Sequence, residues 1–401
     1  MNFTELGLNA RMVSRLEGQG LAKPTPIQAK AIPHALQGRD VLGIAQTGTG
    51  KTAAFGIPLV VALSKHQEKA APRSARGLIL APTRELANQI VESLRGLSAD
   101  LRINLVVGGK SINAQSQKLS RGSDILVATP GRLIDLMDRR AVDLRQTRFL
   151  VLDEADQMLD IGFIHALRQI APMLNKDRQT MMFSATMPKA MTELSREYLT
   201  DPVRVEVSPP GKVADKVSHS VHFVAKDEKQ SLLIDLLGGH REDLTLVFSR
   251  TKHGAERLMK NLDRAGFSAT SIHGNKSQGQ RDRAIAAFKA GSVRVLVATD
   301  VAARGIDIPG VGYVYNYDLP NVPENYVHRI GRTARAGREG RAVAFCAADE
   351  VAELKAIEKV LGTRVEVAGG VPWPSKNDTR KPSAKRPPRR RPRRRSARIA
   401  A

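Results

Sequence analysis

AQTGTGKT, residues 45–52, lies between a short apolar run typical of a buried strand and a segment typical of a helix start. Strand, glycine-rich turn and helix form a phosphate-binding loop, because backbone N–H groups and the positive helix end face the anion. Gly48 and Gly50 allow the backbone to turn around a polyphosphate. Lys51 is placed to reach the β and γ phosphates, and the hydroxyl of Thr52 suits Mg²⁺. The other candidate nucleotide contacts in the loop are Gln46, Thr47 and Thr49.

Acidic residues elsewhere in the chain support this interpretation. The general pattern G-x-x-x-x-G-K-[ST] has Ala45 at its first position here, so the loop alone is not decisive. The apolar run 149–152 is followed by Asp153-Glu154-Ala155-Asp156. Carboxylates at a strand end suit Mg²⁺, which Asp153 would hold, and a water molecule that Glu154 would orient or deprotonate. Ser184-Ala185-Thr186 follow another strand-like run, where their hydroxyls are placed to hydrogen-bond the acidic loop.

The composition favours a polyanionic partner. Net charge is +23 over 401 residues, and part of this excess lies in residues 376–401, which hold 12 Lys and Arg against one Asp. The rest of the chain is basic as well. A single cysteine, Cys346 in an apolar run, excludes an intrachain disulfide and a cysteine-rich zinc site, and we predict a buried strand thiol.

The termini and the hydropathy pattern predict a soluble, cytoplasmic protein with no membrane association. The N-terminus Met1-Asn2-Phe3-Thr4-Glu5 has neither the basic region nor the apolar region of a secretion signal. Apolar runs also stay shorter than the roughly 18 residues that a membrane-spanning helix requires.

Short aliphatic runs alternate with helical segments along most of the chain, which predicts an α/β protein with parallel sheets covered on both faces. The runs expected as strands are 41–44, 77–80, 103–107, 124–128, 149–152 and 180–183, then 217–224, 245–248, 268–272, 293–297, 311–315 and 342–345. The Pro/Gly-containing segment from residue 207 separates the two series. We therefore predict a first domain at 1–207, a linker at 208–217, a second domain at 218–368 and a disordered basic tail at 369–401.

Three strand-like runs of the first half end in turns that combine hydroxyl, glycine and basic residues. These turns are Pro82-Thr83-Arg84, Gly108-Gly109-Lys110 and Thr129-Pro130-Gly131-Arg132. Such groups bind nucleic-acid phosphates without reading bases, and open α/β sheets place ligands at the carboxyl ends of their strands. Aromatic residues make up only 4% of the chain, which disfavours binding by base stacking on an open platform.

A glutamine before the phosphate loop is a candidate for base recognition. Lys23-Pro24-Thr25-Pro26 predicts an extended entry, and Gln28 would open a helix that ends near Gly38. A glutamine amide donates to and accepts from one adenine edge at the same time. Phe3 is a candidate to stack on the adenine ring.

The second half carries no GKT loop but has HRIGRTARAG at 328–337. Arg329, Arg332 and Arg335 recur every three residues, so on a helix they would form one ridge. Such a ridge, facing a nucleotide held by the first half, would supply an arginine finger to the γ-phosphate. The neighbouring ATDVAARGID, residues 298–307, places Asp300 and Asp307 near a strand end.

Taken in order, these motifs resemble those of the DEAD-box RNA helicases over residues 1–365. The N-terminal sequence is similar to that of the bacterial RhlE-like branch. The resemblance implies two tandem RecA-like domains that close on ATP, Mg²⁺ and RNA. It also implies that Phe3 and Gln28 recognise adenine, and that Asp307 contacts the ribose. It implies that Ser184, Thr186 and His328 couple hydrolysis to strand release, and that Arg332 and Arg335 reach the γ-phosphate. The RNA-backbone positions that it implies are Pro82, Thr83, Arg84, Gly109, Thr129, Gly131, Arg132, Thr251, Gly274, Gln278, Arg281, Thr299 and Asp300.

One departure from the family pattern concerns Ala334, where the family often has glycine; a positive φ at this residue would be a strain. The basic tail is expected to tether RNA with a strongly salt-dependent affinity. An RNA clamp or annealing chaperone that uses ATP only as a timer is the alternative function, and a DNA translocase shares the expected fold. Ribosomal particles and the RNA-decay machinery are possible partners and pathways, and a monomer is expected, but the sequence names neither the RNA nor the oligomeric state.

Overall fold

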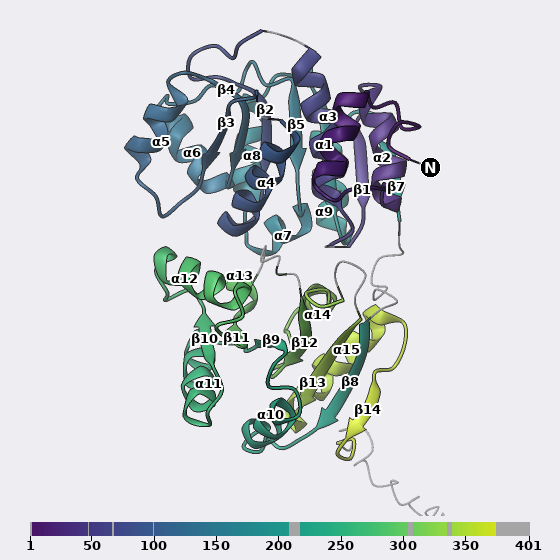
Figure 1. Ribbon diagram of the computed structural model, residues 1–401, viewed down its shortest axis with the longest axis vertical. Helices are drawn as coiled ribbons and strands as arrows, with labels where there is room; N and C mark the ends of the chain where they lie inside the picture. The colour runs from purple at the N-terminus through teal and green to yellow at the C-terminus, as the bar shows by residue number, and fades with distance from the viewer. Residues whose placement is uncertain are drawn as a thin grey trace, which may run out of the picture.

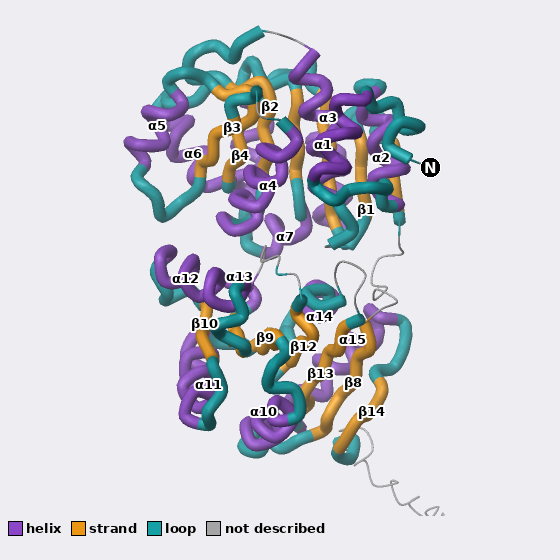
Figure 2. The backbone as a smooth tube through the Cα atoms, viewed as in Figure 1, coloured by secondary structure: helices purple, strands orange, loops and turns teal. Residues whose placement is uncertain are grey.

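The computed structural model describes residues 2–46, 48–65, 68–98, 100–207, 217–303, 308, 310–334 and 339–373. Two layered α/β units follow each other along the chain, each with a central sheet between helices (Figures 1 and 2). Three predicted site residues, Thr47, Asp307 and Arg335, lie outside the described residues, as do most of the predicted linker and the tail from residue 374.

The first unit has a parallel sheet with the strand order β3-β4-β2-β5-β6-β1-β7. Its strands are β1 (Val41–Ile44), β2 (Ala75–Leu80), β3 (Ile103–Val106), β4 (Ser123–Ala128), β5 (Phe149–Leu152), β6 (Gln179–Ser184) and β7 (Val203–Glu206). Its helices are α1 (Ala10–Gly18), α2 (Pro26–Leu36), α3 (Lys51–Lys65), α4 (Arg84–Leu97), α5 (Ile112–Leu119), α6 (Pro130–Asp138), α7 (Ala155–Asp160), α8 (Ile164–Ile170), the 3₁₀ turn η1 (Ala171–Met173) and α9 (Lys189–Tyr198).

The second unit repeats this topology, with the strand order β10-β11-β9-β12-β13-β8-β14. Its strands are β8 (Val217–Phe223), β9 (Leu244–Phe248), β10 (Ala269–Ile272), β11 (Val295–Ala298), β12 (Val311–Asn316), β13 (Gly340–Cys346) and β14 (Glu366–Gly369). Its helices are α10 (Lys229–Gly238), α11 (Lys252–Arg264), α12 (Gln278–Lys289), α13 (Asp300–Ala303), α14 (Glu324–Ile330), the 3₁₀ turn η2 (Ala348–Glu350) and α15 (Val351–Leu361).

The two parallel sheets confirm the predicted α/β fold class, and each of the twelve predicted strands overlaps an observed strand. The prediction missed β7 and β14, which are the edge strands next to β1 and β8. Both are four residues long, and the side chains of β14 are largely exposed, so neither shows the continuous apolar run of a central strand. They adopt the strand conformation because each pairs with a neighbouring strand, β7 with β1 and β14 with β8.

Alternate side chains of each central strand pack on opposite faces of the sheet. In β6, Met181 and Phe183 join the core beneath α1 to α4, whereas Met182 joins the core beneath α6 to α9. Burial on both faces explains why the central strands read as continuous apolar runs. In the described part of the chain, the helices are all too short or too polar to cross a membrane.

The helix that contains Gln28 begins earlier than predicted. Pro26 is the first residue of α2, with Thr25 as the N-cap, so Pro26 belongs to the helix and not to the extended entry. Proline suits the first helical position because its missing N–H would have no intrahelical partner there. Gln28 consequently occupies the third position, where its Oε1 accepts from the backbone N–H of Thr25 at 3.0 Å.

Residues 369–373, predicted to begin the tail, are part of the second unit. Gly369 ends β14, and the indole N–H of Trp373 donates to the carbonyl of Cys346 at 2.9 Å. Cys346 is buried, as predicted, and burial raises the pKa of its thiol to about 12. The thiol therefore stays protonated near neutral pH and is no nucleophile.

Candidate nucleotide and nucleic-acid sites

The strand order sorts the predicted residues of the first unit into two groups. The phosphate loop follows β1 and the acids follow β5, and both strands border β6, which ends at Ser184-Ala185-Thr186. The three turns predicted to bind a nucleic-acid backbone follow β2, β3 and β4, which are also neighbours. Carboxyl ends of parallel strands meet at one edge of a sheet. The edge that faces the second unit thus carries a nucleotide half and a nucleic-acid half (Figure 1).

The phosphate loop has the backbone that its glycines were expected to provide. Gly48 and Gly50 have φ of +84° and +90°, in the left-handed region that glycine adopts without strain. A Cβ atom at Gly50 would lie 2.4 Å from Nε2 of Gln28. That Nε2 donates to the carbonyl of Gly50 at 3.0 Å, so Gln28 is bound to the phosphate loop itself.

Lys51 is the first residue of α3 and is 6% exposed. Its Nζ is buried and, among the described residues, has no hydrogen-bond partner. A buried ammonium group without a partner is costly, and a polyphosphate would supply the missing acceptors. The Lys51 side chain is therefore suited to bind the phosphates of a nucleotide.

Asp153 lies buried at the end of β5, close enough to Lys51 for the two charges to interact. Burial raises the pKa of Asp153 to about 7, and Lys51 opposes this shift. A carboxylate and the hydroxyl of Thr52 are donors that Mg²⁺ prefers. Phosphates and water would complete the coordination of an ion held by these two groups.

Glu154 and Asp156, the other two acids after β5, are held in a defined geometry. Glu154 is buried and has a φ of +50°, a left-handed backbone that is unusual for a residue with a side chain. Asp156 Oδ2 accepts from the N–H groups of Ala185 and Thr186 at 3.1 and 2.9 Å and from the Thr186 hydroxyl at 3.0 Å. The hydroxyl of Ser184 donates to the carbonyl of Thr186 at 2.7 Å. The residues Ser184-Ala185-Thr186 therefore contact the acidic loop through Asp156.

His328 of the second unit reaches the same acidic loop. Its Nε2 lies 3.8 Å from Asp156 Oδ2. Burial lowers the pKa of His328, which favours the neutral ring, and Asp156 opposes this shift. Arg332 is buried close by in the chain. A contact between the two units thus converges on the acids that follow β5.

The predicted helical ridge of arginines is wrong. Helix α14 ends at Ile330, so Arg332 lies beyond the helix. Arg329 is 2% exposed and donates to both carboxylate oxygens of Asp300, at 2.5 and 2.8 Å. Its Nη1 also donates to Asn316 and to the carbonyl of Asp318. Arg329 is therefore buried in the second unit, where it ties the end of β11 to the end of β12.

The two predicted adenine contacts differ in their surroundings. Phe3 is 2% exposed and packs in the core with Leu6, Leu8 and Ile27. The ring has no exposed face on which a base could stack in this structure. Gln28 is also buried, with its amide bonded to Thr25 and Gly50. The adenine roles of Phe3 and Gln28 stay predictions.

A groove of about 290 Å³ brings seven of the thirteen predicted backbone-binding residues together. Its lining residues come from both units: Pro82, Thr83, Arg84, Glu85, Gly108, Thr129, Gly131, Arg132, Asp135, Ile161, Phe163, Arg281 and Val301. The sequence reasoning missed Ile161, Phe163 and Val301, since isolated apolar residues read as core. Val301 is 60% exposed, which marks it as a surface group.

Four side chains bridge the two units at this groove. Glu85 Oε1 accepts from Arg281 at 3.0 Å and from Gln278 Nε2 at 3.1 Å. Arg84 donates to Gln278 Oε1 at 3.1 Å. Gly109, with φ of +74°, leaves room for Arg84, whose guanidinium a Cβ there would hit. The bridge connects the start of α4 with the start of α12.

The three candidate turns of the second unit follow β9, β10 and β11, which are adjacent in the sheet. Thr251 is the N-cap of α11, and its Oγ1 accepts from the N–H of Gly254 at 3.0 Å. Gly274 follows β10, and Thr299 precedes the short helix α13. This arrangement repeats the one after β2, β3 and β4, so each sheet presents equivalent turns to the other unit.

Comparison with known proteins agrees with this geometry. Residues 25–194 match the family described as DEAD/DEAH box helicase, and residues 228–337 match the helicase conserved C-terminal domain. A DEAD-box ATP-dependent RNA helicase of Bacillus cereus, CshA, is 42% identical over 366 residues, which cover 91% of this chain and 69% of that protein. The chain belongs to the DEAD-box ATP-dependent RNA helicases.

Solved structures of two other proteins share the arrangement of both units. S. cerevisiae Dbp5 bound to RNA and ADP BeF3 is similar with a TM-score of 0.82 and 32% identity, over 92% of this helicase and 95% of that chain. Mss116p bound to ssRNA and AMP-PNP is similar with a TM-score of 0.83 and 28% identity, over 94% of this helicase and 80% of that chain. The two units of this helicase are therefore RecA-like domains.

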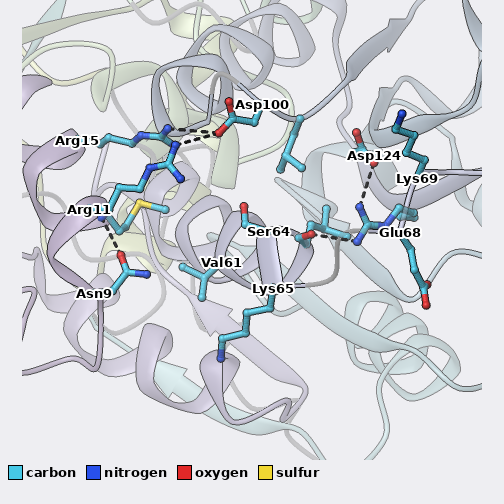
Figure 3. A pocket seen from close by; sticks show the side chains of 14 residues that line it. Asn9, Arg11, Arg15, Val61, Ser64, Lys65, Glu68, Lys69, Asp100 and Asp124 are labelled. Carbon is cyan, nitrogen blue, oxygen red and sulfur yellow. Dashed lines mark hydrogen bonds and ion pairs between the residues drawn. The ribbon is translucent and has the colours of Figure 1, made fainter.

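A cavity of about 480 Å³ lies in the first domain away from these sites, between α1 and the end of α3 (Figure 3). It is lined by several arginines and lysines, but its arginines are paired. Arg11 and Arg15 both reach Asp100, and Arg76 binds Asp124 at 3.0 Å (Figure 3). The first two pairs connect α1 to the loop after α4, and the third connects β2 to β4. The cavity includes no predicted site residue of the helicase.

Glu256 on α11 holds the turn that contains Gly274. Its Oε2 accepts from Ser271, His273 and Lys276 at 2.6, 3.0 and 2.9 Å. The hydrogen bonds from Ser271 and His273 lower the pKa of Glu256 to about 2. A carboxylate with a lowered pKa contributes stability above its unfolded-state pKa, near 4.3, and loses this contribution as the pH falls towards about 2.

Glu256→Gln should lower the free energy of unfolding of the helicase by about 1 kcal/mol at pH 7, a value reduced for solvent screening of a partly exposed side chain. The difference from the wild type should shrink as the pH falls from about 4.5 towards about 2. Thermal unfolding across this pH range measures both effects. Glu242→Gln, at an exposed carboxylate 3.4 Å from Arg294, is the matched control. If the stability difference between Glu256→Gln and the wild type stayed constant with pH, the prediction would be contradicted.

The departure at Ala334 does carry strain. Its φ is +55°, a left-handed conformation that costs alanine roughly 1 kcal/mol more than glycine. Ala334→Gly should therefore raise the free energy of unfolding by up to about 0.6 kcal/mol, after the larger unfolded-state entropy of glycine is counted. Chemical denaturation measures the change. Ala286→Gly, the same substitution at an exposed position inside α12, should have the opposite sign. If both substitutions changed the free energy of unfolding in the same direction, this explanation would be contradicted.

Proposed function

We propose that this helicase separates short RNA duplexes locally, or remodels RNA–protein complexes, by closing its two domains on ATP and on one RNA strand. The interdomain bridge carries this proposal: Glu85 with Arg281 and Arg84 with Gln278 join the domains at the groove lined by the candidate RNA residues. A strand in that groove would contact both domains, so closure would bend it away from its complement.

The residues after β1 and β5 would bind and hydrolyse ATP. Lys51 would bind the β and γ phosphates, since its buried Nζ has no other acceptor among the described residues. Thr52 and Asp153 would hold Mg²⁺, which neutralises developing phosphate charge when it is bound. Glu154 would orient the attacking water and accept its proton, and Arg332 and Arg335 would stabilise charge on the γ-phosphate.

The contacts of Asp156 support a coupling role. Asp156 binds Thr186 of its own domain and lies 3.8 Å from His328 of the other domain. A change at the γ-phosphate that moves the acidic loop would move both contacts. We infer that Ser184, Thr186 and His328 transmit hydrolysis to the opening of the RNA groove.

Recognition of RNA would be independent of sequence. The groove residues include threonines, glycines and arginines at strand ends and helix starts, which are types that bind backbone phosphates and sugars. Thr251, Gly274, Thr299 and Asp300 would extend these contacts on the second domain. The basic segment 376–401 would add a salt-dependent tether.

ATP hydrolysis with and without single-stranded RNA, in parallel with single-stranded DNA, tests the proposal. RNA should raise the rate and DNA should not. Strong RNA binding with an ATPase rate indifferent to RNA would contradict it and favour an RNA clamp or annealing chaperone. Equal stimulation by DNA would keep the enzyme class and remove the claim of RNA selectivity.

We also propose a first domain at 1–207, and a second domain predicted at 218–368 that extends to Val217 of β8 and to residues 369–373, which β14 and Trp373 attach to it. From the sequence, we further propose an RhlE-like branch and a cytoplasmic monomer. The relatives with 42% identity are named CshA. Ribosomal particles or the RNA-decay machinery as partners would follow from a backbone-directed RNA site of this kind.

A further inference from the structure

A buried ion pair underlies the RNA side of the second domain. Lys229 on α10 and Glu350 in η2 are both nearly inaccessible, and Lys229 Nζ donates to Glu350 Oε2 at 2.5 Å. Glu350 Oε1 also accepts from Arg250 at 2.8 Å and from the N–H of Leu319 at 3.2 Å. A buried carboxylate with several donors has a fixed position. The pair therefore forms a rigid base beneath the ends of β9 and β12.

Asp318, just after β12, connects this base to the turn that follows β9. Its Oδ2 accepts from the backbone N–H of Arg250 at 2.8 Å and from the hydroxyl of Ser249 at 3.1 Å. Its Oδ1 lies 3.7 Å from Lys229 Nζ. Thr251, the candidate RNA contact, is the next residue along the chain. The carboxylate of Asp318 thus sets the backbone that presents Thr251.

The main chain of Asp318 also joins a second RNA turn. Its carbonyl accepts from Arg329 Nη1 at 2.6 Å, and Arg329 binds both oxygens of Asp300. Asp300 follows Thr299 at the end of β11. One residue without a predicted role therefore links the turns after β9 and β11.

We propose that Asp318 is a positioning residue for RNA binding, which holds the Ser249-Arg250-Thr251 turn in the geometry that contacts the RNA backbone. This inference rests on the proposed RNA role of Thr251. The side chain of Asp318 is 23% exposed and its acceptors are used by the protein, so it acts through Thr251 and not by its own contact with RNA.

Asp318→Asn in the full-length helicase tests the proposal. The amide leaves one oxygen to accept from Ser249 or Arg250 and places an NH₂ group towards Lys229. The RNA concentration that half-saturates ATPase stimulation should rise about fivefold to tenfold, as expected for one lost hydrogen bond, while kcat at saturating RNA stays within about twofold. Removal of a negative charge by itself would strengthen RNA binding, so the expected change has the opposite sign.

Asp349→Asn is the matched control, because it removes the same charge from an exposed pair with Lys226 in the same domain. It should leave the half-saturating RNA concentration unchanged or lower it. Ser249→Ala removes one of the two donors to Asp318 and should give a smaller rise in the same direction. It keeps the test open if Asp318→Asn fails to fold.

A double-mutant cycle with Thr251→Ala separates this inference from the proposed function. If Asp318 acts through Thr251, the double variant should match Thr251→Ala alone. Additive effects, or an effect of Thr251→Ala with none of Asp318→Asn, would overturn the positioning role. No effect of Thr251→Ala would instead remove the proposed RNA contact on which the inference rests.

Discussion

Glu154→Gln should lower the RNA-stimulated kcat for ATP hydrolysis by about 100-fold to 10,000-fold, the range of general-base catalysis. Glutamine has almost the same shape but cannot accept a proton from the attacking water. Glu154 is buried next to Asp153 at the end of β5, and the charge of Asp153 interacts with that of Lys51, the residue that would hold the phosphates. Steady-state ATPase measurements at saturating RNA give the size of the loss.

The affinities of the Glu154→Gln variant for ATP and RNA should stay within a few-fold of the wild type, because the substitution leaves the proposed binding groups intact. Asp160→Asn, at an exposed acid that ends the helix following Glu154, is the control and should keep the wild-type rate. If Glu154→Gln retained more than about a tenth of the wild-type kcat, another group would have to activate the water.

Loss of the interdomain ion pair should have the second-largest effect. Glu85→Gln or Arg281→Gln should each lower kcat divided by the half-saturating RNA concentration by about 10-fold to 100-fold, because each leaves a buried charge without its partner. The side chains of Glu85 and Arg281 are 7% and 16% exposed, so water cannot replace the lost contact well. ATPase titrations with RNA measure the ratio.

The double variant Glu85→Gln with Arg281→Gln should be no worse than the more damaging single variant, which is the signature of a direct interaction. Glu197→Gln, in an exposed pair with Arg168 of the first domain, should change nothing. Fully additive losses would mean that Glu85 and Arg281 act separately, and that the bridge does not define the closed state.

Much of the site was predictable because its chemistry is local. The loop 45–52 combines glycines, a lysine and a hydroxyl within a few residues, and the acids 153–156 directly follow an apolar strand. Such segments carry both their structure and their reactivity in adjacent residues. The alternation of apolar runs likewise predicted each central strand, since burial on both faces of a parallel sheet demands it.

The failures share a cause in contacts between residues far apart in the sequence. The ridge of arginines assumed that a helix continues past Ile330, but α14 ends there and Arg329 is turned into the core by Asp300 and Asn316. The strands β7 and β14 have too few apolar residues to be recognised alone. The adenine role of Phe3 stays a prediction, and only the tertiary structure shows that its ring is buried against Leu6 and Ile27.

For this helicase, the amino-acid sequence is enough to locate the central strands along the chain, the phosphate loop, the acids and the family resemblance. These depend on residue type, periodicity and spacing, which are properties of neighbouring residues. Tertiary structure alone decided which strand ends are adjacent, that Glu85 meets Arg281, that Asp318 holds the turn before Thr251, and that Ala334 has a positive φ. The physical reason is that sheet order and domain docking are set by the burial of the whole core, to which every segment contributes and which no single segment encodes.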